Sequence, residues 1–293
     1  MTIEFRYSVV SDLMYHILAH MKVENASDLF SQSYIVSADR MKNGQYDSIA
    51  EYAVRLSEYY NTNFNRLGII NFLPFEHTSV RSLIDALGNY PGFSENDREA
   101  FILPLTQLIQ KETAFYEAYW AQLYDTTAAC RNAFECWITN EMKKYEALFS
   151  YFNKSAVVGL SYSLTNNGRG YGGATSFNAI VPFVYDKNCY KGSFYQILHE
   201  YTHQFTDRLL GESIRMDDGT HALSEKAVIL FDYYLIKQLC AEDVDGYLQW
   251  LCSLSNADPC DEQLFLSVFR LDDDVNGRLT ALAETIAGKA GIQ

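Results

Sequence analysis

The sequence predicts an α+β protein that is predominantly helical. Apolar side chains recur at helical spacing through residues 1–152. Residues 156–185 instead hold β-branched and aromatic runs around a glycine-rich stretch, which is typical of strands and turns. Helical patterns return at 193–210 and 220–239, and short helices fill the C-terminus. We therefore expect a helical N-terminal region, 1–152, and a second unit, 153–293, that contains a small sheet.

Capping residues mark several helix boundaries in the N-terminal region. Thr78 and Gly88 bracket one helix, and the segment from Ser94 to Asp97 resembles a capping box. Pro104 should kink or break the next helix because proline has no backbone donor. The expected helices are Val9–Met21, Ile49–Tyr60, Ser79–Leu87 and one or two long helices between about 106 and 151.

The second unit should begin with two strands. Ala156–Leu164 and Ala174–Tyr185 are rich in strand-forming residues, and the sequence Asn166-Asn167-Gly168 between them resembles a hairpin turn. Pro182 cannot donate to a ladder, so we place the second strand at a sheet edge. Ser193 with Gln196 has the spacing of a capping box, which predicts that the next helix starts there.

The composition excludes several classes of protein. Of 293 residues, 48% are hydrophobic and 15% aromatic, which excludes intrinsic disorder. With 23 basic and 37 acidic residues the formal net charge is −14, so nucleic acid and anionic membrane are poor candidates as partners. The chain shows neither a secretory signal nor an apolar run near the roughly 18 residues of a membrane span. No Cys-x-x-Cys pair occurs. We expect a cytoplasmic protein with reduced cysteines.

One motif in the helix 193–210 indicates metal chemistry. His199 and His203 lie four residues apart, so they occupy one helical face and can share a metal ion. Zinc lowers the pKa of a bound water to about 7. Glu200, adjacent to the first histidine, is placed to accept the proton of that water. His16 and His20 share the spacing but have no glutamate between them, so we interpret them as core or interface histidines.

A catalytic zinc needs a third protein ligand. Glu225 is the best candidate, because two helices joined by a loop can pack antiparallel and bring it to the histidines. His221, one turn earlier on the same helix, is the rival. Asp207 lies about 12 Å along the helix from His199, too far for one ion to bind both.

The segment His199-Glu200-Tyr201-Thr202-His203-Gln204-Phe205-Thr206-Asp207, followed by Glu225, resembles the gluzincin metallopeptidases, which include thermolysin. The resemblance implies a zincin-like domain, zinc held by His199, His203 and Glu225, Glu200 as general base, and a peptide or protein substrate. It also implies an edge strand that pairs with the substrate. By position that strand includes Asn178 and Ala179.

Two other interpretations remain open. Family members carry an aspartate four residues after the glutamate ligand, where this chain has Ile229, so a catalytically degenerate protein that acts as a binding or scaffold module is the alternative. A deformylase-like amide hydrolase would need a cysteine ligand. Cys189 is the nearest candidate, but its neighbours do not match that family's cysteine motif.

Overall fold

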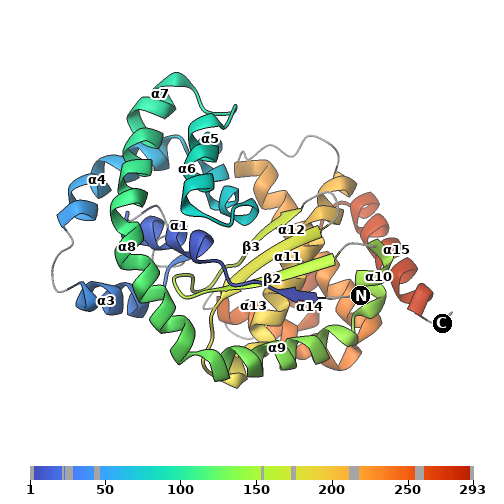
Figure 1. The fold of residues 1–293 in the computed structure, drawn as a ribbon. Helices are drawn as coiled ribbons and strands as arrows, with labels where there is room; N and C mark the ends of the chain where they lie inside the picture. The colour runs from blue at the N-terminus through green and yellow to red at the C-terminus, as the bar shows by residue number, and fades with distance from the viewer. Residues whose placement is uncertain are drawn as a thin grey trace.

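The computed structural model describes residues 3–21, 23, 29–42, 47–152, 155–172, 176–210, 218–254 and 261–290. It confirms a mostly helical α+β fold, built around a four-stranded sheet (Figure 1). The strands are β1 (Ile3–Phe5), β2 (Ser155–Ser161), β3 (Arg169–Gly172) and β4 (Ser176–Pro182). The helices before β2 are α1 (Val9–His20), α3 (Gln32–Met41), α4 (Asp47–Thr62), α5 (Phe64–Leu67), α6 (Val80–Asn89), α7 (Glu95–Asp97), α8 (Leu103–Thr126), α9 (Ala128–Lys143) and α10 (Glu146–Phe152). Those after β4 are α11 (Tyr190–Leu210), α12 (Asp218–Leu239), α13 (Val244–Leu254), α14 (Glu262–Phe269) and α15 (Asp273–Ala290).

The N-terminal helix predictions agree with the structure in most places. The capping box at Ser94 is present, with Asp97 as its reciprocal partner. Ser79 rather than Thr78 caps α6. A π-helical turn, Arg98–Ile102, precedes Pro104, which lies in the first turn of α8 where its missing donor costs little. Among the described residues, no helix is both long and apolar enough to cross a membrane.

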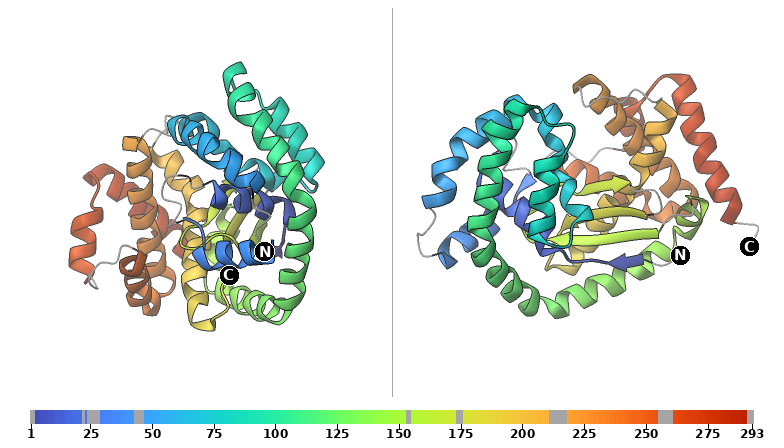
Figure 2. Two further views of the ribbon diagram at one scale, coloured as in Figure 1. Left: turned by 90° about the vertical axis from the view of Figure 1, so that its left-hand side faces the viewer. Right: turned by 45° about the horizontal axis from the view of Figure 1, so that its top comes forward.

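The sheet is mixed, with the order β1-β2-β4-β3. β1, β2 and β4 are parallel to one another, and β3 is antiparallel to β4. The first strand was not predicted, because three residues are too few to show an alternating pattern. α9 lies beside the β1 edge, where the hydroxyl of Tyr7 donates to Glu135 (Figures 1 and 2).

The prediction that the strand containing Pro182 is an edge strand is wrong. β4 is central, paired with β2 on one side and with β3 on the other. Pro182 is tolerated because the β3 ladder reaches only to Ile180. The backbone N–H of Phe183 donates to Ser161 of β2, so the nitrogen of Pro182 faces the opposite side, beyond the end of β3. The edge strand on this side of the sheet is β3.

The predicted hairpin turn and the predicted start of the following helix are also wrong. The turn at Asn166–Gly168 does not join paired strands, because β2 and β3 are separated by β4. α11 begins at Tyr190, after a 3₁₀ turn at Lys187–Cys189, so Ser193 is not its cap. The amide of Gln196 instead donates to the carbonyl of Asn166. The contact ties the β2–β3 connection to α11.

Both faces of the sheet are buried, by different helices. Along β4, Phe177, Ala179 and Val181 face a core shared with α9 to α15, whereas Ile180 faces a core formed by α1, α3, α4, α6 and α8. Figure 2 shows these two groups of helices on opposite sides of the sheet. α9 and α10 precede residue 153 but belong to the core with α11. A division of the chain at residue 153 therefore does not separate the residues of one core from those of the other.

Candidate metal centre

Three potential metal ligands converge between α11 and α12. Nε2 of His199 lies 3.2 Å from Nε2 of His203 and 3.2 Å from Oε2 of Glu225. Nε2 of His203 lies 3.4 Å from Oε1 of Glu225. Bonds of about 2.0–2.1 Å at tetrahedral angles place ligand atoms about 3.3 Å apart. The three side chains therefore fit a tetrahedral zinc ion, and they form the one such cluster among the described residues.

The antiparallel packing of the two helices brings these groups together. His199 contacts Glu225, Thr202 contacts Asp232, and further along α11 Asp207 contacts Ser224. Partner numbers fall as α11 advances from Thr202 to Asp207, so the helices run in opposite directions. Residues 211–217, which connect the two helices in the sequence, lie outside the described residues, as does the side chain of His221, the rival ligand.

A buried carboxylate orients the first histidine. Nδ1 of His199 faces Oδ2 of Asp232 at 3.4 Å, and Thr202 donates to the other oxygen of Asp232 at 2.6 Å. Asp232 is fully buried and lies seven residues, two helical turns, after Glu225 on the same face of α12. Asp232 supplies the carboxylate next to His199 that Ile229, an apolar residue, cannot supply. A carboxylate behind a ligating histidine fixes the ring and raises its basicity.

The polar groups behind His203 lie farther from its ring than Asp232 lies from the ring of His199. Nδ1 of His203 lies 3.5 Å from the hydroxyl of Ser224 and 3.9 Å from Oδ1 of Asp207. Ser224 donates to Asp207 at 2.6 Å. Asp207 therefore stands behind the histidine rather than in the ligand cluster, in agreement with the distance argument from its sequence position.

The charges of the cluster shift its pKa values strongly. Burial disfavours the protonated imidazole of His199, but hydrogen bonds to Asp232 and Glu225 outweigh burial and raise its pKa to about 10. At His203, burial is likewise outweighed by Asp207 and Glu225, which raise the pKa to about 9. Burial would raise the pKa of Glu225, but the two histidines hold it well below its usual range. A cation entering this cluster must replace protons.

Glu200 lies on the side of α11 that faces the edge strand. A Cβ atom placed on Gly170 of β3 would lie 2.6 Å from Oε2 of Glu200, so carboxylate and strand are in direct contact. Glu200 does not belong to the ligand cluster. It is therefore free of direct coordination and adjacent to the ligand-bearing His199.

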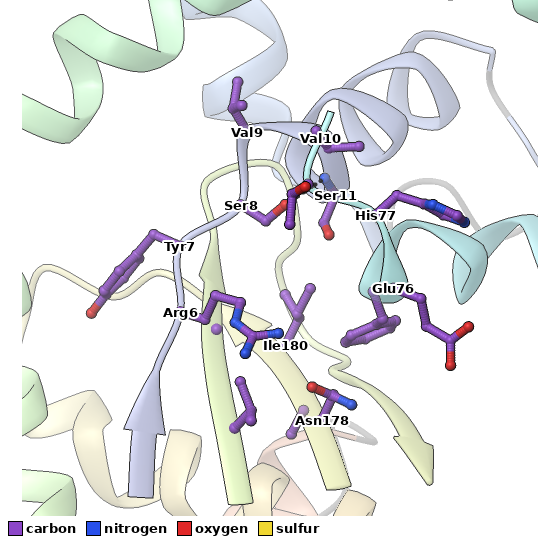
Figure 3. A pocket seen from close by; sticks show the side chains of 15 residues that line it. Arg6, Tyr7, Ser8, Val9, Val10, Ser11, Glu76, His77, Asn178 and Ile180 are labelled. Carbon is purple, nitrogen blue, oxygen red and sulfur yellow. Dashed lines mark hydrogen bonds between the residues drawn. The ribbon is translucent and has the colours of Figure 1, made fainter. Parts of the chain in front are cut away.

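Asn178 and Ala179, the expected substrate contacts, do not lie on an edge strand. Their backbones are paired on both sides, with Val157 and Val158 of β2 and with β3. The side chain of Asn178 faces a cavity of about 260 Å³ between the sheet and the start of α1 (Figure 3). None of the three clustered ligands lines that cavity. Cys189 is exposed, in the turn before α11, and is not part of the cluster.

Comparison with models of protein families, with curated proteins and with solved structures finds no match to this chain. The assignment of function therefore depends on the geometry of the site. Sequence reasoning overlooked Asp232 and β3. Asp232 had a detectable signal, because it is a lone charge within the apolar run from Ala227 to Ile236.

Proposed function

We propose that this protein is a zinc-dependent hydrolase, and specifically a metallopeptidase with a zincin-like site of the gluzincin type. The observation that carries the proposal is the mutual spacing of His199, His203 and Glu225, 3.2 to 3.4 Å, which matches the edges of a zinc coordination tetrahedron. A tetrahedral ion held by three protein ligands keeps one position for water or substrate.

The side chains around the cluster have distinct roles in this proposal. Zinc bound there supplies Lewis acidity, which polarises a carbonyl and makes a water molecule acidic. Glu200 accepts a proton on its carboxylate as the water attacks, and then delivers a proton to the leaving amine. Asp232 holds the ring of His199 through Nδ1, so that Nε2 points into the cluster.

The substrate would pair with β3 rather than with β4. β3 has β4 on one side and no described strand on the other, so its outer edge has free backbone groups. An extended peptide can add to such an edge through main-chain hydrogen bonds. The contact between β3 and Glu200 would bring the peptide close to the general base.

The scaffold alternative loses its main support. It depended on Ile229, which stands where related enzymes have an aspartate. In this chain Asp232 makes the corresponding contact with a ligating histidine from one turn further along α12. The absence of an aspartate at position 229 therefore does not argue against a functional zinc site.

Elemental analysis and an activity assay with a Glu200→Gln variant test this function. We expect about one zinc ion per chain in both proteins and nearly equal melting temperatures, since Gln keeps the size of the side chain. Turnover of a mixed fluorogenic peptide library should fall by about 10²- to 10⁴-fold in the variant, the usual contribution of a positioned acid–base group. A substrate cleaved equally by both proteins, or a protein that cannot be loaded with zinc, would contradict the proposal.

A further inference from the structure

Glycines alternate along the edge strand. Gly170 and Gly172 are two residues apart, so they lie on one face of β3, and Gly168 directly precedes the strand with the same spacing. This is the face toward α11, because a Cβ on Gly170 would meet Glu200 and Phe177. The other face carries side chains, among them Tyr171, whose ring stacks on Phe75 with a centroid distance of 6.2 Å. At Gly170, β3 therefore has no side chain between its backbone and Glu200, the proposed general base.

The space beside Gly170 is already filled. A Cβ there would lie 2.6 Å from Oε2 and 2.9 Å from Cβ of Glu200, and 2.8 Å from Cζ of Phe177. Real Cβ atoms essentially never approach heavy atoms closer than 3.0 Å. The backbone of Gly170 is not in the left-handed region, so other residues can adopt its conformation. Contact with its neighbours, and not a turn, therefore requires glycine at this position.

Gly172 differs although it lies on the same face of the same strand. A Cβ on Gly172 would meet no atom of the described residues within 4 Å. The two positions share strand, face and a backbone outside the left-handed region. They form a matched pair that isolates contact with Glu200 from any general effect of alanine in β3.

We propose that Gly170 is a positioning residue for Glu200: its bare backbone sets where the carboxylate stands relative to the ligand cluster. Two of the three close contacts are with Glu200 itself. The Cβ of Glu200 is fixed by α11, so an added methyl group must either rotate the carboxylate away or push β3 outward. The consequence for catalysis rests on the proposed role of Glu200 as the general base.

The activity test uses Gly170→Ala alone and combined with Glu200→Gln. Gly170→Ala should lower kcat by about 10²-fold, the cost of misplacing a reacting group by about 1 Å, with metal content close to that of the wild type. In the Glu200→Gln background the same substitution should cause no further loss, because the group through which it acts is gone. Equal losses in both backgrounds would overturn the proposal.

A further variant distinguishes the contact with Phe177 from the contacts with Glu200. Phe177→Leu removes the ring atom that a Cβ on Gly170 would meet, while both contacts with Glu200 remain. In the Phe177→Leu background, Gly170→Ala should cost less thermal stability than it does in the wild type but should still lower kcat. If kcat recovers together with stability, the effect of Gly170 is on core packing and the positioning role is wrong.

A spectroscopic measurement is independent of activity. The side-chain carboxyl signal of Glu200 in isotope-labelled protein is assigned by its loss in Glu200→Gln. It should move in Gly170→Ala and stay in place in Gly172→Ala, in metal-free and in zinc-loaded protein. An unmoved signal in Gly170→Ala would overturn the proposal, whereas a moved signal without any peptide cleavage would contradict only the proposed function.

Discussion

The chain contains two pairs of histidines at four-residue spacing, and the structure uses them in opposite ways. The rings of His16 and His20 in α1 lie 4.4 Å apart by their centroids, and those of His199 and His203 in α11 lie 4.8 Å apart. Ring proximity therefore does not distinguish them. The direction of the nitrogens does, because the Nε2 atoms of the second pair converge with Glu225 on one point.

The nitrogens of the first pair turn to separate partners. Nδ1 of His16 contacts the hydroxyl of Tyr34, whereas Nδ1 of His20 contacts the carbonyl of His16. Oε2 of Glu112 lies 3.8 Å from Nε2 of His16 and is also paired with the ammonium of Lys42. This carboxylate therefore already has a cation as its partner. His16 is fully buried in the core, in agreement with the interpretation of this pair as core or interface histidines.

The pKa values of His16 and His199 move in opposite directions. Burial lowers the pKa of His16 to about 4, because the nearby Glu112 compensates only in part and is shared with Lys42. His199 is mostly buried, yet two carboxylates raise its pKa to about 10. What makes a histidine pair suitable for a metal is therefore the number of uncompensated carboxylates around it, rather than its spacing alone.

Removal of a histidine from the His199–His203 pair should have the largest effect among the changes that test the difference between the two pairs. His203→Ala should abolish stoichiometric zinc binding, because two ligands do not hold a structural or catalytic zinc ion. The matched variant His20→Ala removes the second histidine of the other pair and should leave metal content at about one ion per chain. Elemental analysis after extensive dialysis measures both. Metal loss in His20→Ala would show that the two pairs are not functionally distinct.

Breaking the charge pair beside His16 should affect stability instead. Glu112→Gln removes the carboxylate that is paired with the ammonium of Lys42, a side chain about nine-tenths buried. We expect the free energy of unfolding to fall by about 3–5 kcal/mol, the usual cost of breaking a buried ion pair by removing one partner. Urea denaturation measures this loss, and zinc content serves as the control that should not change.

The lowered pKa of His16 predicts an acid-dependent loss of stability. The unfolded chain binds a proton at His16 near its ordinary pKa of 6.5, whereas the folded chain does so only near 4. Unfolding is therefore favoured as the pH falls from about 6.5 to 4, by at most about 3 kcal/mol. The difference in stability between wild type and His16→Gln, measured at several pH values, should shrink across this range. A constant difference would contradict the assignment.

The smallest expected effect concerns the support of the metal cluster. Asp232→Asn keeps the shape of the side chain but removes the charge behind His199. Zinc affinity should fall by about 10- to 100-fold, the usual loss when such a partner of a ligating histidine is changed. Asp207→Asn should have less effect, because its carboxylate lies 3.9 Å from the ring of His203. Competition with a chelator measures both affinities.

The sequence predicted those features that depend on short separations. Helix spacing places His199 and His203 on one face, and a single loop suffices to return Glu225 to them. The order of the strands depends instead on partners far apart in the chain. β1 is too short to recognise. Pro182 indicates that one backbone donor is missing from the ladder, but it does not indicate which neighbouring strand ends before that position. Placing the substrate at Asn178 followed from that misreading.

Asp232 was missed for a related reason. A family pattern specifies an aspartate at one spacing from the ligand, but the helix offers the same face again after a further turn. Any carboxylate on that face can reach Nδ1 of His199, provided that the packing of α11 on α12 buries it. The position of the support therefore follows from the packing of two helices and not from a fixed spacing.

The separations in the chain also carry an entropic consequence. His199 and Glu225 are 26 residues apart, whereas Ile3 of β1 meets its partner Ala156 across 153 residues. Closing the longer loop costs about 1.6 kcal/mol more than closing the shorter one, by the logarithmic dependence of closure entropy on length. The candidate metal centre thus belongs to the part of the topology with low contact order, while attachment of the N-terminal strand requires the most expensive closure in the sheet.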